Sequence, residues 1–112
     1  MTVETRREKE ITVAAITGRM DALTASDVER TLMRLLDEGA RTLLIDLGGL
    51  DYISSAGLRT LLAAAKRMKA QAGTMAFVNL KGHAKEVFEI SGFYSLFTVY
   101  DSVESALERL GR

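Results

Sequence analysis

The sequence predicts a single α/β domain spanning residues 1–112, with a mixed, mostly parallel sheet of four to five strands packed with about four helices. Two observations predict this class. Short runs of β-branched and apolar residues alternate along the chain with longer segments in which apolar residues recur at helical spacing. The chain also has no proline, no Gly/Ser-rich stretch and no internal repeat, so nothing divides its 112 residues into two domains.

Five segments carry the predicted strands. The run at 42–46 is apolar with little alternation, which is typical of a central strand covered on both faces. The run at 11–17 is rich in β-branched residues and ends at Gly18, and the weaker segment 3–7 is predicted to pair with it as an antiparallel edge. The remaining strands are predicted at 74–78 and 96–100.

Four helices are predicted from apolar periodicity and from their caps. Thr24 and Ser26 each have an acidic residue three positions on, which is the pattern of a capping box, and the helix that they open ends at Gly39. A long helix begins near Ser55, after a predicted loop at 47–54. The other two helices are predicted at 84–90, with Ile90 facing inward, and at 103–110 after a Ser102 cap.

Composition and charge argue against several classes of protein. Fifteen basic and fifteen acidic residues leave no net charge, whereas a protein that holds nucleic-acid phosphates usually has a basic surplus. The absence of cysteine removes disulfides, zinc-thiolate sites and thiol nucleophiles. The N-terminus lacks the apolar stretch of a signal peptide, and no apolar run is long enough to span a bilayer. We therefore expect a cytoplasmic protein without a membrane span.

The motifs of common enzyme sites are absent from the sequence. No glycine loop ends in Gly-Lys-Ser/Thr, as phosphate-loop nucleotide binding requires. The run Ser54-Ser55-Ala56-Gly57 lacks the glycine that stands two residues before the nucleophile in a Gly-x-Ser-x-Gly elbow. His83, the single histidine, is interpreted as a solvated surface residue at a helix start. We therefore expect no enzyme activity, no metal site and no cofactor.

Asp46 leaves one catalytic alternative open, a phospho-receiver domain. Such a domain is phosphorylated on an Asp at the end of a central strand, where Asp46 is predicted to lie. That chemistry also needs a nearby acidic pair to hold Mg²⁺, and here Asp21 stands alone after the preceding strand. Labelling of Asp46 by acetyl phosphate would support this alternative.

Ser54 and Ser55 stand at the start of the long helix, and their hydroxyls have two interpretations. Serine is a favoured N-cap, so one hydroxyl has a structural role. The free amides and the dipole at a helix start also favour negative charge, by about 0.3–1 kcal/mol near the surface. A phosphate on Ser55 would therefore be accepted without unfolding, and the small neighbours Ala56 and Gly57 would leave room for another protein to approach.

The segment 46–58 resembles the signature of the STAS family, and in particular of the bacterial anti-sigma-factor antagonists. That family has Asp-Leu, a short gap, an aromatic and an apolar residue, and then Asp-Ser-Ser-Gly-Leu. Two further motifs match in order: Gly18-Arg19-Met20-Asp21 resembles the turn after the family's second strand, and 84–93 resembles its later helix with a Ser-Gly-apolar end. The counterparts of the main signature are Asp46-Leu47, Tyr52-Ile53 and Ser54-Ser55-Ala56-Gly57-Leu58.

The resemblance implies a partner switch. In the family, a serine kinase that is also an anti-sigma factor phosphorylates the serine two positions before the glycine, and a metal-dependent phosphatase removes the phosphate. The unmodified protein binds the anti-sigma factor and so frees a sigma factor. On this chain the phosphorylated serine maps onto Ser55, with Ser54 as the alternative acceptor, and Asp21 maps onto the acidic turn residue that helps to form the partner surface.

The chain departs from the family pattern next to the acceptor, because Ser54 replaces an Asp and Ala56 replaces a Ser. Ser54 then either caps the helix or is itself modified. The alternative function is a STAS scaffold or transport-associated adaptor without a phosphate cycle. The residues expected to contact the partner are Asp21, Ser54, Ser55, Ala56, Gly57 and Arg59.

For two further sets of residues, the sequence does not decide between a binding surface and an ordinary structural role. The basic residues of the long helix form either a docking stripe or its solvated side: Arg59, Lys66, Arg67 and Lys69. A set near the end of the chain either forms an exposed patch for a homodimer or packs inside the fold: Leu96, Phe97 and Tyr100.

Overall fold

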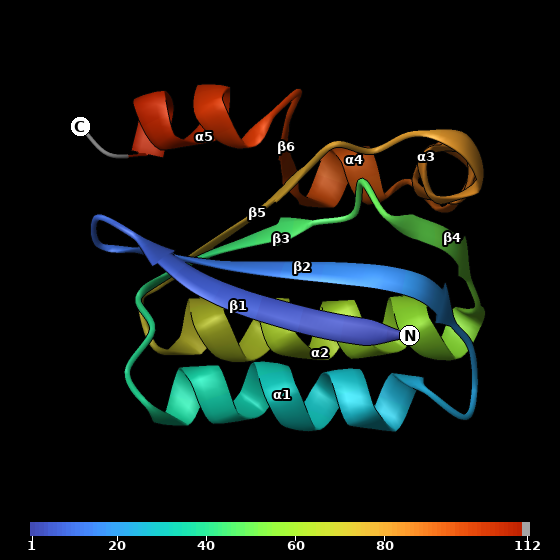
Figure 1. Ribbon diagram of the computed structural model, residues 1–112, viewed down its shortest axis with the longest axis horizontal. Coiled ribbons are helices and arrows are strands. Elements are labelled where there is room, and N and C mark those ends of the chain that lie inside the picture. The colour runs from blue at the N-terminus through green and yellow to red at the C-terminus, as the bar shows by residue number, and fades with distance from the viewer. Residues whose placement is uncertain (111–112) are drawn as a thin grey trace.

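The computed structural model describes residues 1–110 and has six strands and five helices within them (Figure 1). The strands are β1 (Thr2–Glu8), β2 (Ile11–Met20), β3 (Thr42–Asp46), β4 (Leu50–Ile53), β5 (Thr74–Val78) and β6 (Thr98–Tyr100). The helices are α1 (Ala25–Asp37), α2 (Ser55–Ala70), α3 (Gly82–Ser91), α4 (Phe93–Leu96) and α5 (Val103–Leu110). The α/β class is confirmed, with one strand and one helix more than predicted; residues 111–112 of the predicted domain lie outside the described residues.

The sheet has the strand order β1-β2-β3-β5-β6, and β4 pairs with β2 outside this path. β1 and β2 are antiparallel, with Thr2 opposite Thr17 and Glu8 opposite Ile11. The other strand pairs of the described chain are parallel. This arrangement confirms the predicted mixed, mostly parallel sheet with the first strand as an antiparallel edge.

β2 changes its neighbour along its length. Its residues 12–15 pair with β3, and its last residues, 18–20, pair with β4 after a register shift. The prediction of a loop over 47–54 is therefore wrong, because this segment contains a strand. β4 has only four residues and follows two glycines, which hides it from a sequence pattern. Gly49 lets it approach β2, since a Cβ there would lie 2.7 Å from Thr17 Cγ2.

The last strand is shorter than predicted, because residues 93–96 form α4. Gly92 ends α3 in the left-handed conformation, with φ 78°, and the chain turns directly into the short helix. Leu96 is consequently helical and 64% exposed. Ile90, predicted to face inward, is 87% exposed, because Phe88 is the residue of this turn that fills the core.

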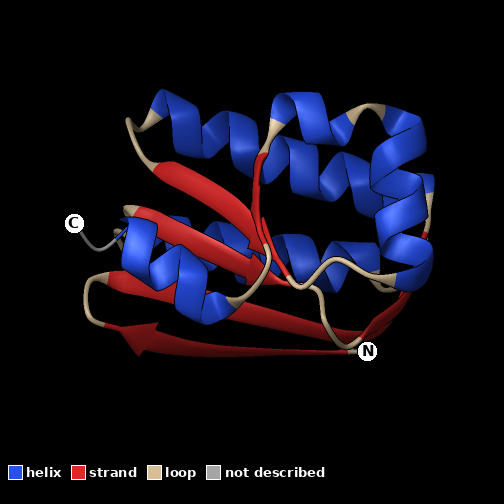
Figure 2. Cartoon of the chain, turned by 90° about the horizontal axis from the view of Figure 1, so that it is seen from above, coloured by secondary structure: helices blue, strands red, loops and turns tan. Residues whose placement is uncertain are grey.

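Two apolar cores lie against opposite faces of the sheet, since alternate strand residues point to opposite sides. Leu43, Ile45 and Phe77 enter the larger core, whereas Leu44 and Val78 enter the smaller one. α1 and α2 lie side by side against the larger core (Figure 1). α5 covers the smaller core and lies across the strands when the molecule is seen from above (Figure 2).

The ends of β2 and β4 bring two distant segments together at one end of the sheet. Met20 pairs with Ile53, so the residues that follow them, Asp21 and Ser54, leave neighbouring strands side by side. α1 starts shortly after the first of these strands, and α2 starts directly after the second (Figure 1). The predicted partner residues Asp21 and Ser55 therefore belong to one region of the surface.

Candidate functional site

Ser54 is the N-cap of α2. Its backbone is extended, with φ −90° and ψ 173°, and its Oγ accepts a hydrogen bond from the Gly57 N–H at 3.2 Å. Its own N–H donates to the Met20 carbonyl of β2 at 2.8 Å. The cap satisfies one of the amides that a helix start leaves free, and the second bond fastens this start to the sheet.

Ser55 is the first residue of α2, and it is exposed. Within residues 1–110, the Ser55 hydroxyl forms no hydrogen bond. The positive end of the α2 dipole lies at this residue, where a negative group is favoured. The two adjacent serines therefore differ in their surroundings: Ser54 is half-buried and bonded, whereas Ser55 is free and open to solvent.

Gly57 lies beneath the serine pair and is buried, whereas Ala56 is half-buried. A Cβ on residue 57 would lie 2.7 Å from Met20 Sδ and 2.8 Å from Ile53 Cγ1. The missing side chain lets the first turn of α2 rest directly on the ends of β2 and β4. The small size of Gly57, interpreted above as room for a partner, is thus accounted for by packing inside the domain.

The basic residues of α2 lie in two different surroundings. Arg67 is half-buried and forms an ion pair with Asp37 of α1, so it joins the two helices. Arg59, Lys66 and Lys69 are exposed. Arg59 follows Ser55 by four residues, which places both side chains on one side of the helix, one turn apart.

Asp21 organises the turn between β2 and α1. Its Oδ1 accepts hydrogen bonds from the N–H groups of Leu23 and Thr24, both at 3.0 Å. Thr24 Oγ1 in turn accepts from the Asp21 N–H at 2.9 Å and donates to the Arg19 carbonyl at 2.8 Å. The predicted capping box at Thr24 is therefore wrong, because this hydroxyl is engaged inside the turn and makes no cap bond to α1.

The hydrogen bonds of this turn also hold the pKa of the Asp21 carboxyl below its ordinary value of 3.8. The bond from the Thr24 N–H contributes most, and partial desolvation opposes it. The Thr24 hydroxyl, the Leu23 N–H and the charge of Arg19 lower the pKa further. Asp21 is therefore ionised at neutral pH, and the turn presents a fixed carboxylate beside α2.

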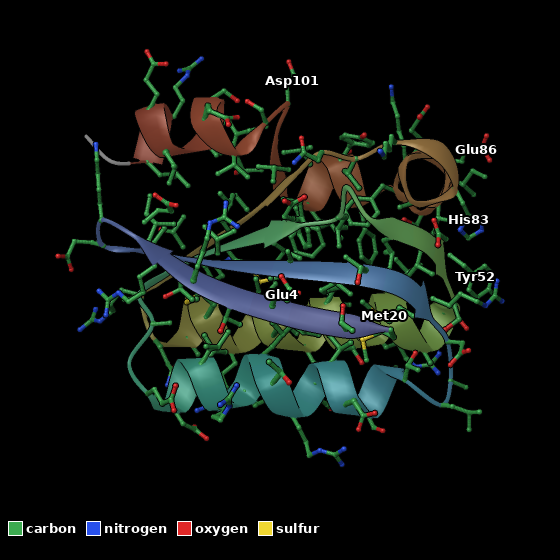
Figure 3. The ribbon with its side chains drawn as sticks, in the orientation of Figure 1. Glu4, Met20, Tyr52, His83, Glu86 and Asp101 are labelled. Atoms are coloured by element: carbon green, nitrogen blue, oxygen red, sulfur yellow. The ribbon has the colours of Figure 1, made fainter. Side chains whose placement is uncertain are left out.

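Two residues of this region were missed by the sequence interpretation. Leu23, at the tip of the Asp21 turn, is 86% exposed, although it is a large apolar side chain. His83, interpreted as a solvated surface residue, is half-buried, and its ring stacks on that of Tyr52. Figure 3 labels the two side chains near each other. An isolated leucine in a polar turn was the available signal for Leu23. No local sequence pattern could have predicted the contacts of His83, because its hydrogen-bond partner Ile53 lies thirty residues earlier in the chain.

Asp46 has a structural role at the end of β3. Its Oδ1 accepts hydrogen bonds from the Gly48 N–H at 2.9 Å and from Asn79 Nδ2 at 3.0 Å, so it joins the loops that follow β3 and β5. Within residues 1–110, no group of three or more His, Asp or Glu side chains is placed to hold a metal ion. No helix in the same range combines the length and apolar character needed to cross a membrane.

The comparisons with known proteins agree with this fold. The chain belongs to the STAS family, because the STAS domain model matches residues 2–106. BtrV of Bordetella bronchiseptica, named as a candidate anti-sigma factor antagonist, is 45% identical over 94 residues, which cover 84% of this chain and 81% of BtrV. The family resemblance drawn from the sequence motifs is confirmed.

Solved structures show the same fold at lower identity. An anti-sigma factor antagonist from Mycobacterium paratuberculosis has a TM-score of 0.90 at 21% identity, covering 99% of this chain and 94% of its own. The Bacillus cell fate determinant SpoIIAA, in its phosphorylated form, has a TM-score of 0.76 at 20% identity, covering 97% and 99%. The single-domain STAS fold is thus shared along almost the whole length of these chains.

Proposed function

We propose that this chain is an anti-sigma-factor antagonist that switches partners through Ser55. In its unmodified form it binds an anti-sigma factor that is also a serine kinase, and so leaves a sigma factor free to direct transcription. Phosphate on Ser55 releases that partner, and a metal-dependent serine phosphatase restores the unmodified form. Membership of the STAS family and the name of the related BtrV support this class of function.

The observation that carries the proposal is the free, exposed hydroxyl of Ser55 at the start of α2. A kinase needs an accessible hydroxyl, and the dipole of α2 favours the charge that it adds. Ser54 is the poorer acceptor, because its Oγ already caps the helix through Gly57. The division of roles between the two serines supports Ser55 as the modified residue.

The proposed contact surface consists of Asp21, Leu23, Ser55 and Arg59, and we refer to it as the Ser55 surface. Asp21 and Leu23 sit on a turn fixed by four side-chain hydrogen bonds, so little conformational freedom is lost when a partner binds. Leu23 supplies an apolar anchor of the kind that fills a pocket in a partner.

The energy of the switch requires Ser55 to lie inside the contact. A hundredfold loss of affinity corresponds to about 2.7 kcal/mol. An exposed ion pair changes binding by only about 0–1 kcal/mol, which is too little. A phosphate with a charge of about −2 that is desolvated without a partner can cost about 2–5 kcal/mol. Ser55 follows the end of β4, which pairs with the end of β2 just before Asp21, and it precedes Arg59 by one helical turn, which is consistent with this requirement.

We further infer that the role is regulatory rather than catalytic, needs no cofactor, and is carried out in the cytoplasm. The balance of fifteen basic and fifteen acidic residues argues against direct binding to nucleic acid. Control of transcription would therefore act through protein partners.

The test is phosphorylation by the cognate serine kinase with ATP and Mg²⁺, followed by mass spectrometry and by calorimetry with the anti-sigma factor. Wild type is expected to gain one phosphate on Ser55 and then to bind at least about 100-fold more weakly. Ser55→Ala is expected to gain none and to keep its affinity, and Ser55→Glu is expected to bind weakly without any kinase.

Ser54→Ala is the matched control, because it changes the neighbouring hydroxyl and leaves Ser55 in place. It is expected to accept one phosphate on Ser55, more slowly than wild type because the helix cap is lost. If Ser55→Ala is phosphorylated as well as wild type and then loses affinity for the anti-sigma factor as wild type does, the proposal is wrong. A wild-type chain that accepts no phosphate from any serine kinase would support the scaffold or adaptor function instead.

The homodimer stays a prediction. Phe97 and Tyr100 are half-buried against the two cores, so Leu96 is the exposed apolar residue of the predicted patch. Leu96 lines a groove of about 340 Å³ together with Met75 and Lys69. Sedimentation velocity tests it: a dimer that Leu96→Ser converts to monomer would confirm the contact, and a monomeric wild type would exclude it.

A further inference from the structure

His83 lies in the first turn of α3, where it reaches the last residue of β4. Its Nδ1 accepts a hydrogen bond from the backbone N–H of Ile53 at 3.3 Å. A neutral imidazole accepts through one nitrogen only when the proton is on the other, so this contact requires the tautomer with the proton on Nε2. A side chain of α3 is thus hydrogen-bonded to the end of β4, the strand that leads into Ser54.

The ring of His83 is held in place by Tyr52, whose own ring is contacted by Arg19. The rings of His83 and Tyr52 are stacked, with centroids 4.9 Å apart and planes 16° apart. The Arg19 guanidinium lies over the same Tyr52 ring, with Cζ 4.2 Å from the centroid. Figure 3 shows Tyr52 and His83 next to each other at the β4 side of the molecule. The stack therefore joins β2, β4 and α3.

The Ile53 amide needs a partner that the sheet does not supply. Ser54 directs its N–H toward β2, where it donates to the Met20 carbonyl. Successive amides of a strand point to opposite sides, so the Ile53 N–H points away from β2. On that side β4 pairs with no other strand of residues 1–110. Ile53 is only 3% exposed, so water does not take the place of a strand. His83 Nδ1 is the acceptor on that side.

We propose that His83 is a positioning residue, whose Nδ1 fixes the end of β4 and thereby holds the Ser54 cap and the Ser55 hydroxyl in the geometry that the kinase and the anti-sigma factor bind. This inference rests on the function proposed for Ser55. His83 acts through the backbone of residues 53–55, while the Ser55 hydroxyl remains the group that is modified. Without the acceptor, the buried Ile53 amide loses its partner and the end of β4 opens more readily.

Two variants separate the acceptor of His83 from its ring. His83→Asn places an Oδ1 acceptor near the position of Nδ1 and removes the stacked ring, whereas His83→Phe keeps a ring and removes the acceptor. Glu86→Ala is the matched control, because Glu86 is an exposed residue of the same helix. All three proteins are compared with wild type as full chains.

The first measurement is hydrogen exchange of the Ile53 amide by NMR, which needs no partner. His83→Phe is expected to speed this exchange about tenfold, while His83→Asn and Glu86→Ala stay within about threefold of wild type. Protection of Ile53 that is unchanged in His83→Phe would overturn the proposal. If a variant fails to fold, the ring ¹⁵N spectrum of the wild-type chain provides a second test. A proton on Nδ1 of His83 at neutral pH would overturn the proposal, because that nitrogen could not accept the Ile53 bond.

The second measurement is the rate of Ser55 phosphorylation together with the affinity for the anti-sigma factor. His83→Phe is expected to lose about tenfold in both, and His83→Asn is expected to restore them, because it returns the acceptor. A loss in His83→Asn with none in His83→Phe would assign the effect to the ring, and either that result or equal losses in the two variants would overturn the role of Nδ1. If wild type itself accepts no phosphate, the proposed function fails, and the exchange of Ile53 still decides whether His83 holds β4.

Discussion

Two helices of this domain, α2 and α5, begin with a serine cap, and they are fastened in different ways. In α5, Ser102 Oγ accepts from the Ser105 N–H at 3.1 Å, and Ser105 Oγ accepts from the Ser102 N–H at 3.2 Å. In α2, Ser54 caps Gly57, which has no side chain to return the bond. The N–H of Ser54 is instead bonded to the Met20 carbonyl of β2.

The difference shows how a helix start can be rigid and still leave a hydroxyl free. The reciprocal cap of α5 is self-contained and uses both of its serine side chains. The start of α2 is fixed by the sheet and by one serine, so the hydroxyl of Ser55 has no structural contact within residues 1–110. Anchoring by tertiary structure leaves this side chain available for chemistry.

The largest effect is expected from a change that lifts α2 off the sheet. Gly57→Ala places a Cβ against Met20 and Ile53, and this close contact is expected to destabilise the domain by about 1–3 kcal/mol. The better helix propensity of Ala offsets about 0.5–1 kcal/mol of that cost. Thermal unfolding measures it as a drop of several degrees in Tm. Ser55→Ala is the control and should change stability by less than about 0.5 kcal/mol. An unchanged Tm for Gly57→Ala would show that α2 does not need this close contact.

A smaller effect is expected when either cap is removed. Ser54→Ala and Ser102→Ala should each cost about 1 kcal/mol, because each leaves one helix amide without its acceptor. Urea unfolding measures both. The assignment of the cap fails if Ser55→Ala costs as much as Ser54→Ala.

A still smaller change, of opposite sign, is expected from Ser55→Glu. The carboxylate lies at the positive end of α2 and four residues before Arg59, so it should stabilise the helix by about 0.3–1 kcal/mol at low salt. Ser55→Gln is the uncharged control. Because the effect is electrostatic, it should shrink as salt is added. Destabilisation by Glu at every salt concentration would contradict the claim that this site tolerates a negative charge.

The smallest effect is expected in the turn before α1, whose stability should change only in acid and not near neutral pH. The pKa of Asp21 is lowered in the folded chain, so the turn is fully stabilised above the ordinary value of 3.8 and loses this stabilisation as the pH falls through the folded pKa. The amide shifts of Leu23 and Thr24, followed by NMR in acid, report the change. Asp21→Asn keeps an acceptor oxygen and should make these shifts independent of pH. A pH dependence that survives in Asp21→Asn would assign the titration to another group.

Much of the fold could be predicted, because its helices and inner strands carry strong periodic patterns. Val28, Leu32 and Leu35 mark the buried face of α1, and the apolar run of β3 marks a central strand. β4 and α4 escaped prediction, since each has four residues and lies in a segment where long-range contacts decide the structure.

The position of the site could also be predicted, but the roles of its residues could not. The sequence places Ser54 and Ser55 at a helix start, and either serine could serve as the cap until the direction of each hydroxyl is known. Thr24 has the spacing of a cap and is engaged instead by Asp21. The bond from Ile53 to His83 joins residues thirty positions apart, and no local pattern announces it.

Within residues 1–110, β2 pairs with three strands, β1, β3 and β4, and six of its ten residues are buried. Ser54 is bonded directly to the end of this strand. Because Ser55, the next residue, is exposed, a group added there is expected to change the surface of the domain and to leave its core packed as before. Under the proposed function, a kinase and a phosphatase would therefore meet the same backbone in every cycle, and repeated modification would need no refolding.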